Sequence, residues 1–276
     1  MRVRYSFSSR RTGHIDNMLK QRQKVPDIIK NLIRISDIVL EILDARFIEE
    51  TRNLELEKEI KDSGKNIVYV LNKADLADIK QAKEKLEILK LNPYIFISCT
   101  KRKGKSDLIR MIKMEAKKSN YPRAHIGIIG YPNTGKSSLI NYLTGRGSAG
   151  TAREAGFTKG IQKIKLAEGI LLLDSPGVIP ENENSAVISK DLVKHAKINV
   201  RTFDKVKNPE FVVSELMKEY PGVFEKYYEI DAKGDSEILI EQLGKKKGLI
   251  IKGGEVDCDR VSRVILKDWQ AGKIRV

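Results

Sequence analysis

Short apolar runs alternate with longer amphipathic segments over the first two thirds of the chain. Runs of branched apolar residues predict strands over 38–43, 66–71, 94–97, 125–129 and 170–173. Apolar residues at helical spacing predict helices over 82–89, 108–116 and 137–143. Because strands that alternate with helices form sheets covered on both faces, the pattern predicts an α/β domain with a mostly parallel sheet.

The pattern changes after residue 177, where helical spacing alone continues. It predicts helices over 185–198, 209–216, 236–243 and 258–269. We therefore expect three regions: a basic N-terminal extension over 1–24, the α/β domain over 25–200, and a small helical domain over 201–276. Trp269 shares an apolar stripe with Val261, Val264 and Ile265, which favours a core anchor over a base-stacking platform.

Composition narrows the class of protein. Of the 276 residues, 41% are hydrophobic and 32% are charged, which is typical of a soluble globular chain. No apolar run approaches the roughly 20 residues that span a bilayer, and no apolar stretch follows Met1 as in a secretory signal. We expect a cytoplasmic monomer that does not bind membranes. Cys99 and Cys258 lack metal-ligand spacing and are expected to be small, partly buried residues.

The net charge of +15 favours an anionic partner, and nucleic acid is the commonest large one. Residues 1–30 carry 8 basic and 2 acidic side chains, and residues 244–276 carry 9 and 4. No RNA-binding motif with exposed stacking aromatics occurs. The charge therefore predicts that the helical domain contacts the backbone of folded RNA.

Residues 130–137 match the phosphate-loop pattern G-x-x-x-x-G-K-S and stand between a predicted strand and a predicted helix. In such a loop, backbone N–H groups and the helix N-terminus surround the β-phosphate. Lys136 would reach the β- and γ-phosphates, and the Ser137 hydroxyl would bind Mg²⁺. The remaining candidate nucleotide contacts in the loop are Asn133, Thr134, Gly135 and Ser138.

A second motif, Asn72-Lys73-Ala74-Asp75, predicts guanine specificity. The Asp75 carboxylate can accept hydrogen bonds from guanine N1–H and N2–H₂, a donor pair that adenine lacks. Asn72 can tie the base to the phosphate loop, and the Lys73 stem can cover the base. Ser98 and Cys99, at the next strand end, are similar to the loop whose backbone contacts guanine O6. GTP and GDP are thus the expected ligands; a P-loop kinase, which would bind ATP equally well, is the alternative.

The sequence Asp174-Ser175-Pro176-Gly177 matches D-x-x-G. Asp174 would bind Mg²⁺ through water, and the Gly177 N–H would contact the γ-phosphate. Thr158 is preferred over Thr151 as the threonine that completes the Mg²⁺ shell, because it leads into a predicted strand over 161–166. Val178 stands where small GTPases commonly carry a water-orienting glutamine, so hydrolysis must recruit another group.

The motifs occur in an unusual order, because the base-reading motif precedes the phosphate loop. Ordinary GTPases begin with the phosphate loop, and circular permutation costs a fold little, because domain termini often lie close together. Besides the order of the motifs, several segments carry a resemblance that extends over nearly the whole chain. They are Gly13-His14, Asp44-Ala45-Arg46 and the motifs at 72–75, 130–133, 156–160 and 174–177. On these residues the sequence resembles the circularly permuted GTPases of ribosome assembly, specifically the YlqF/RbgA-like family.

The resemblance implies binding to the large ribosomal subunit or its precursor and to rRNA, with GTP hydrolysis timing release. It implies a low intrinsic rate that the partner stimulates, with His14 in place of the missing glutamine. It also implies that Asn133 helps to hold K⁺ beside the phosphates. For His14, a structural or RNA-contacting role stays open; for Asn133, a role in turn geometry.

Further alternatives concern Asp44 and the protein as a whole. Asp44-Ala45-Arg46 could act near the nucleotide or organise the N-terminal segment, and a structural salt link is the simpler interpretation. Because Val178 cannot orient water, an RNA-binding module that uses GTP as a structural ligand stays open. So does a GTPase that acts on another RNA.

Overall fold

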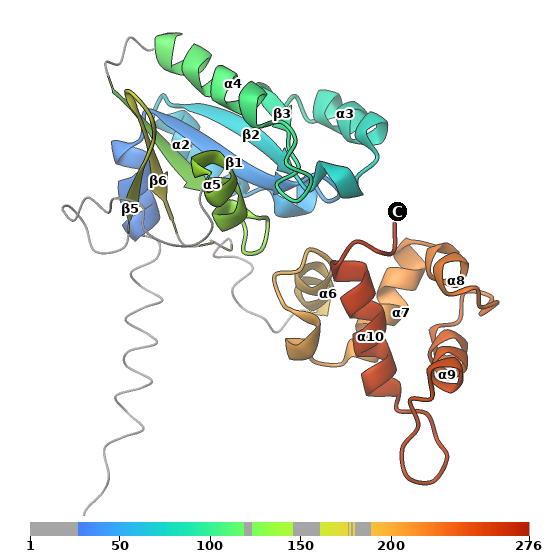
Figure 1. The fold of residues 1–276 in the computed structure, drawn as a ribbon. Coiled ribbons are helices and arrows are strands. Elements are labelled where there is room, and N and C mark those ends of the chain that lie inside the picture. The colour runs from blue at the N-terminus through green and yellow to red at the C-terminus, as the bar shows by residue number, and fades with distance from the viewer. Residues whose placement is uncertain are drawn as a thin grey trace, which may run out of the picture.

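A six-stranded sheet with flanking helices and a separate group of helices make up the described part of the chain (Figure 1). The structure is a computed structural model, and it describes residues 27–118, 123–145, 161–175, 177, 179 and 189–275. Candidate residues His14, Thr151, Thr158 and Val178 lie outside these ranges.

The sheet has the strand order β3-β2-β1-β4-β6-β5. Its strands are β1 Ile38–Asp44, β2 Asn66–Asn72, β3 Tyr94–Phe96, β4 Ala124–Ile129, β5 Gln162–Ala167 and β6 Ile170–Asp174. Every neighbouring pair is parallel except β5 and β6, which are antiparallel. The predicted α/β class with a mostly parallel sheet is therefore confirmed.

The register of the central strands brings the motif residues to one edge. In the pairing of β1 with β2, Asp44 is opposite Asn72, and in that of β4 with β6, Ile128 is opposite Asp174. All seven residues of β1 are buried, as expected of a strand covered on both faces. Parallel strands end on the same side of a sheet, so the segments that follow them share one crevice.

Helices cover both faces of the sheet. They are α2 Leu54–Asp62, α3 Ile79–Ile88, α4 Lys105–Lys118 and α5 Lys136–Thr144, with a further helical segment over 27–35. One apolar core joins the sheet to the segment 27–35, α2 and α3, and a second joins its other face to α4 and α5. The sequence pattern missed 27–35 and α2. Helix α2 reads Leu-Glu-Leu-Glu-Lys-Glu-Ile-Lys-Asp, and its charged residues obscure the apolar spacing.

The remaining helices are α6 Ser189–Lys197, α7 Pro209–Glu219, α8 Val223–Tyr228, α9 Ser236–Lys247 and α10 Cys258–Gln270. They surround Trp269, which is buried and lies 5.4 Å from the Phe224 ring and 5.1 Å from the Tyr220 ring between centroids. The core-anchor interpretation of Trp269 is confirmed. Helix α8 was not predicted because six residues are too short for a clear period.

The two parts of the molecule share a core. Phe47, which follows β1, stacks on Trp269 at 5.9 Å, and Tyr131 of the phosphate loop packs into the same apolar cluster. Helix α6 and the residue after it contribute Ala196 and Ile198 to this cluster. The domain boundary at residue 200 stays a prediction, although α6 packs with the C-terminal helices.

Two surface features bear on the sequence predictions. Cys99 is half-buried as expected, whereas Cys258 is exposed, and that prediction is wrong. Cys258 is the first residue of α10 and precedes Val261, where the buried stripe of this helix begins. Among the residues that the structure describes, no helix has the length and apolar character needed to cross a bilayer.

Candidate nucleotide-binding site

The phosphate loop connects β4 to α5 through three residues with positive φ, of which Gly130 is the first, with a φ of 145°. Asn133 has a φ of 61° and Gly135 a φ of 101°. Asparagine tolerates this conformation better than most residues, and glycine adopts it without strain. Inside the loop, the Thr134 hydroxyl donates to the Tyr131 carbonyl at 2.9 Å. The loop therefore has the tight backbone that the G-x-x-x-x-G-K-S pattern predicts.

The base-reading motif begins at Asn72, the last residue of β2, and continues into the short helix η2, Ala74–Leu76. The buried Ser98 hydroxyl donates to Asp75 Oδ1 at 2.6 Å and accepts from the Lys101 N–H at 2.9 Å. Ser98 thus fixes one carboxylate oxygen of Asp75 from the neighbouring strand end. Sequence reasoning grouped these residues by family likeness, and the structure supplies the hydrogen bond that joins them.

Asn72 joins the base-reading motif to the phosphate loop. Its Nδ2 donates to the Thr134 carbonyl at 2.9 Å, and its Oδ1 accepts from the Cys99 N–H at 3.4 Å. A Cβ added to Gly135 would lie 2.1 Å from Asn72 Nδ2. Only glycine permits this close approach, so the pattern of the loop and the position of Asn72 depend on each other. The hydrogen bond joins the two motifs, and the role of Asn72 in tying a base to the loop stays a prediction.

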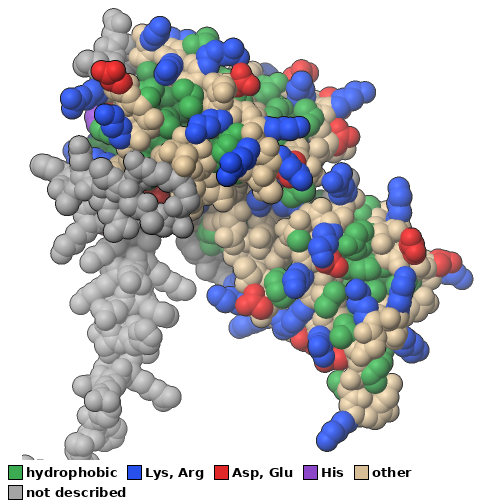
Figure 2. Space-filling view, viewed as in Figure 1, with side chains coloured by type: hydrophobic (Ala, Val, Ile, Leu, Met, Phe, Trp, Pro, Cys, Tyr) green, Lys and Arg blue, Asp and Glu red, His purple; other side chains and the backbone are tan. Residues whose placement is uncertain are grey.

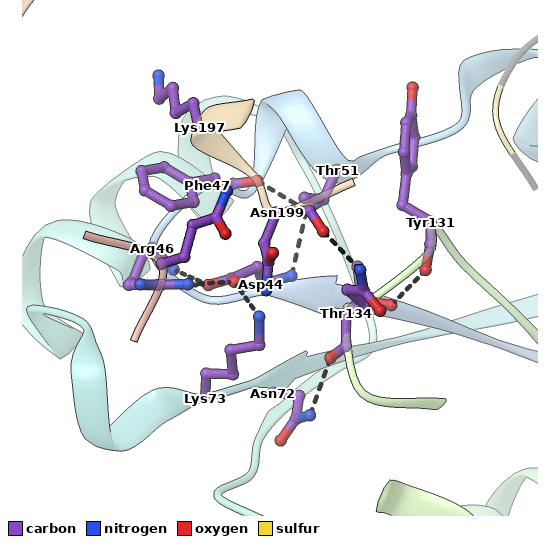
Figure 3. A network of polar contacts seen from close by, with 12 residues as sticks. Asp44, Arg46, Phe47, Thr51, Asn72, Lys73, Tyr131, Thr134, Lys197 and Asn199 are labelled. Carbon is purple, nitrogen blue, oxygen red and sulfur yellow. Dashed lines mark hydrogen bonds and ion pairs between the residues drawn. The ribbon is translucent and has the colours of Figure 1, made fainter. Parts of the chain in front are cut away.

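Lys73 makes an ion pair with Asp44 that the sequence analysis did not predict (Figure 3). Its Nζ lies 2.8 Å from Asp44 Oδ2, and Arg46 binds both oxygens of the same carboxylate at 3.0 and 2.8 Å. Burial alone raises the pKa of Asp44, but the hydrogen bonds and charges of Arg46 and Lys73 outweigh it and lower the pKa below its usual value. Asp44 is therefore an ionised, fully buried carboxylate.

Lys136 lies at the other end of the site. Its Nζ donates to the carbonyls of Gly130 and Tyr131 at 2.8 and 2.6 Å. Burial lowers the pKa of Lys136 to about 8, with an opposing contribution from Asp174. Burial raises the pKa of Asp174, opposed by the charge of Lys136. A Cβ on Gly177 would lie 3.0 Å from Lys136 Nζ, which places the Gly177 backbone against this lysine.

A cavity of about 840 Å³ connects the two ends. Its predicted lining residues are Asn72, Lys73, Asp75, Cys99, Asn133, Gly135, Lys136, Ser137, Ser138, Asp174 and Gly177. Ser98 and Thr134 are buried behind the wall and support it. Residues of both the base-reading motif and the D-x-x-G motif line this cavity, so one elongated ligand can contact both motifs.

Two lining residues, Asn199 and Gln270, come from the C-terminal part of the chain, and sequence reasoning missed them. The Asn199 carbonyl accepts from Asn133 Nδ2 at 2.6 Å. Gln270 Nε2 donates to the carbonyls of Ala196 and Arg201 at 2.9 Å. Neither residue belongs to a motif. Their place at the cavity follows from how α10 packs against the residues after α6, which no local pattern reports.

The cavity residues fit a nucleotide with Mg²⁺. The close approach at Gly135, the lysine among carbonyls and the Asp174 carboxylate across from Ser137 together provide a cradle for phosphates and oxygen donors for a hard cation. Among the described residues, no group of three or more His, Cys, Asp or Glu could hold a metal by itself.

Comparisons with known proteins agree with this geometry. The 50S ribosome-binding GTPase family matches residues 125–229. GTP-binding protein MJ1464 of Methanocaldococcus jannaschii is 39% identical over 259 residues, which cover 91% of this chain and 67% of that protein. The chain belongs to the circularly permuted GTPases. GNP-bound YlqF of T. maritima, a structure of this family, superposes with a TM-score of 0.65 and 25% identity over 91% of this chain and 95% of its own.

The same GTPase family has longer members. Nucleolar GTP-binding protein 2 of Neurospora crassa is 33% identical over 265 residues, which cover 92% of this chain but only 41% of that protein. The chain spans about half the length of the nucleolar relatives that it matches.

Proposed function

We propose that this chain binds GTP and hydrolyses it as a switch in the maturation of the large ribosomal subunit. One observation carries the proposal: a single cavity contains the base-reading Asp75 at one end and the phosphate-loop Lys136 at the other. The relatives support it by name, since they include a 50S ribosome-binding GTPase family and nucleolar GTP-binding proteins.

At the base end, the Asp75 carboxylate accepts hydrogen bonds from guanine N1–H and N2–H₂. Ser98 already donates a hydrogen bond to Oδ1 at 2.6 Å, which restrains the orientation of the carboxylate. Adenine offers no matching donor pair and would leave this charge without its partners. The backbone at Cys99 faces the same cavity and is the candidate contact to guanine O6.

At the phosphate end, Lys136 contacts the β- and γ-phosphate oxygens, and the loop N–H groups from Asn133 to Ser138 surround the β-phosphate. Ser137 and Asp174 would hold Mg²⁺ together with the phosphates, and bound Mg²⁺ would supply charge that stabilises the transferring phosphoryl group. Thr158 would complete the Mg²⁺ shell, and the Gly177 N–H would contact the γ-phosphate. Asn133 would help to hold K⁺ next to the phosphates.

Hydrolysis needs a group that orients water, because Val178 has no hydrogen-bonding side chain. We assign this role to His14, which with Thr158 and Val178 lies outside the described residues. The low rate that such an arrangement gives is raised by the partner. The partner we propose is the precursor of the large subunit, bound through rRNA.

The charge of the surface supports an RNA partner. On the face shown in Figure 2, Lys and Arg side chains are spread over both parts of the molecule, and Asp and Glu side chains are sparser. The net charge of +15 gives an attraction to phosphate backbones that does not depend on sequence. A cytoplasmic location and a monomeric state stay predictions.

The test is GTP turnover by the full chain, with and without purified large ribosomal subunits, in K⁺ and in Na⁺ buffer. We expect subunits to raise the turnover at least about tenfold, and more in K⁺ than in Na⁺. Lys136→Ala is the control that reports contaminating GTPases. If the chain binds GTP tightly and subunits do not stimulate turnover in either buffer, GTP is a structural ligand and the proposal is wrong.

A further inference from the structure

The carboxylate of Asp44 is buried directly behind the base-reading motif. It closes β1, and its exposed fraction is zero. The β1–β2 register sets Asp44 opposite Asn72, one residue before Lys73. Asp44 is not among the residues that line the cavity. Any effect on a ligand must therefore act through a neighbour.

Arg46 alone could satisfy this carboxylate. It donates Nε to Oδ1 and Nη2 to Oδ2, and the Arg46 backbone N–H adds a third bond to Oδ1 at 3.1 Å. A bidentate Arg–carboxylate pair of this kind is sufficient as a structural salt bridge. Lys73 nevertheless brings its Nζ to Oδ2 at 2.8 Å across 29 residues of sequence. The contact with Lys73 therefore calls for a reason beyond neutralising Asp44.

The backbone at Lys73 is also constrained. Its φ of 60° lies in the left-handed region, which is uncommon for residues other than glycine. Such conformations persist where the surroundings fix them and gather at ligand sites. The side chain leaves this turn with its stem lining the cavity and its ammonium on Asp44. Both ends of the Lys73 stem are thus anchored.

We propose that Asp44 is a positioning residue: its carboxylate holds the Lys73 ammonium so that the methylene stem lies across the site of the guanine ring. The inference rests on the proposed function, because it assumes that the cavity takes a guanine nucleotide. A free lysine loses much of its rotamer entropy when it packs on a ligand. A lysine tethered by Asp44 has lost that entropy before the nucleotide arrives, and affinity rises accordingly.

The experiment removes Asp44 without leaving Arg46 as an unpaired buried cation. Asp44→Asn alone would do so, whereas the Asp44→Asn/Arg46→Met pair is uncharged and similar in volume, a change that buried pairs often tolerate. Arg46→Met alone keeps the bond between Asp44 and Lys73. Lys73→Met keeps the stem and removes the ammonium. The measurement is the Kd of a fluorescent GDP analogue for each full-length variant.

We expect Arg46→Met to bind within about threefold of wild type, and the Asp44→Asn/Arg46→Met pair and Lys73→Met each about tenfold more weakly. If Asp44 acts through Lys73, the triple variant Asp44→Asn/Arg46→Met/Lys73→Met binds no more weakly than Lys73→Met, because effects that act through one group do not add. Turnover at saturating GTP should be unchanged in the pair, since lost uniform binding raises KM and leaves kcat.

Asp37→Asn is the matched control, because Asp37 precedes β1 at its opposite end and accepts from the His125 N–H at 2.7 Å. It should bind GDP as wild type does. Two results would overturn the inference: the Asp44→Asn/Arg46→Met pair binding like Arg46→Met, or the Asp44 substitution weakening binding equally with and without Lys73. A wild-type chain that does not bind GDP would instead overturn the proposed function.

Discussion

The two ends of the cavity hold their lysines in opposite ways. At the base end, the Lys73 ammonium is 2.8 Å from a buried carboxylate, and its side chain is 21% exposed. At the phosphate end, Lys136 Nζ contacts two backbone carbonyls, and burial lowers its pKa to about 8. The base end is therefore balanced in charge by the protein itself. The phosphate end has a cation whose balance depends on an anion that shares the cavity.

This difference suits the two halves of a guanine nucleotide. The base is neutral and is read by shape and hydrogen bonds, which favours a rigid, compensated wall. The phosphates bring negative charge, which favours a cation that the protein leaves incompletely neutralised. Asn72 connects the ends through its bond to the Thr134 carbonyl. A ligand that shifts Asn72 at the base end would therefore also act on the backbone of the phosphate loop at Thr134.

The largest expected effect comes from changing the base specificity at Asp75. In Asp75→Asn, the amide offers a donor where guanine also presents donors, whereas xanthine presents a carbonyl at that position. We expect GDP affinity to fall by about 100-fold or more and the affinity for xanthosine diphosphate to rise above it. Competition binding with both nucleotides measures the reversal.

Lys73→Met serves as the control for this reversal, since it weakens binding without altering the hydrogen-bonding pattern at Asp75. It should keep guanine preferred over xanthine. An Asp75→Asn protein that still prefers GDP would contradict the placement of guanine against Asp75.

At each end of the cavity, the sequence could predict features formed by residues close together in the chain and could not predict contacts between residues far apart in it. The strands that end at Asn72, Ile129 and Asp174 are local patterns of the sequence, and the structure confirms them. The bond between Asp44 and Lys73 spans 29 residues and follows from the β1–β2 register, which no local period reports. A short segment such as α8, with six residues, gives too few repeats to establish a helical period.

The C-terminal contributions to the site were beyond prediction for a related reason. Asn199 reaches the phosphate loop because α6 packs with α7 and α10, and Phe47 stacks on Trp269. These contacts depend on how two apolar surfaces meet in three dimensions. The sequence showed that Trp269 belongs to a core, but it carried no sign that a residue following β1 would complete that core.

The phosphate end predicts a pH dependence that the base end lacks. A free Lys136 with a pKa of about 8 loses its proton as the pH rises through that value. Bound phosphates raise its pKa, so binding takes up a proton and affinity falls above pH 8, by up to about tenfold per pH unit. Calorimetric titration with GDP from about pH 7 to 9, in buffers of different ionisation enthalpy, measures both the Kd and the proton uptake.

Lys136→Arg is the control, because arginine stays protonated throughout this range. Its affinity is expected to be lower than that of the wild type but flat with pH. Equal pH profiles for the two proteins would show that Lys136 is charged throughout, and the contrast between the two ends would then be wrong.

The smallest expected effect concerns Glu41, which lies on β1, the strand that also contains Asp44. It is a buried carboxyl whose Oε1 accepts from the Asn53 N–H at 2.9 Å, and the charged groups around it are Glu57 and Arg52. Burial, and then the charge of Glu57, raises the pKa of Glu41 from 4.5 to about 8. Asp44 has two cations in contact and Glu41 has none, so the two carboxyls should respond oppositely to pH.

Between about pH 4.5 and 8 the folded chain holds a proton on Glu41 that the unfolded chain releases, so this group's contribution to stability falls as pH rises. Glu41→Gln should therefore raise the free energy of unfolding at pH 8 by on the order of 1 kcal/mol and change it little at pH 5. Urea denaturation at both pH values measures the difference, with the exposed Glu84→Gln on α3 as control. A destabilisation at pH 8 larger than at pH 5 would mean that Glu41 is ionised and paired like Asp44, and that compensation on β1 is not confined to the nucleotide end.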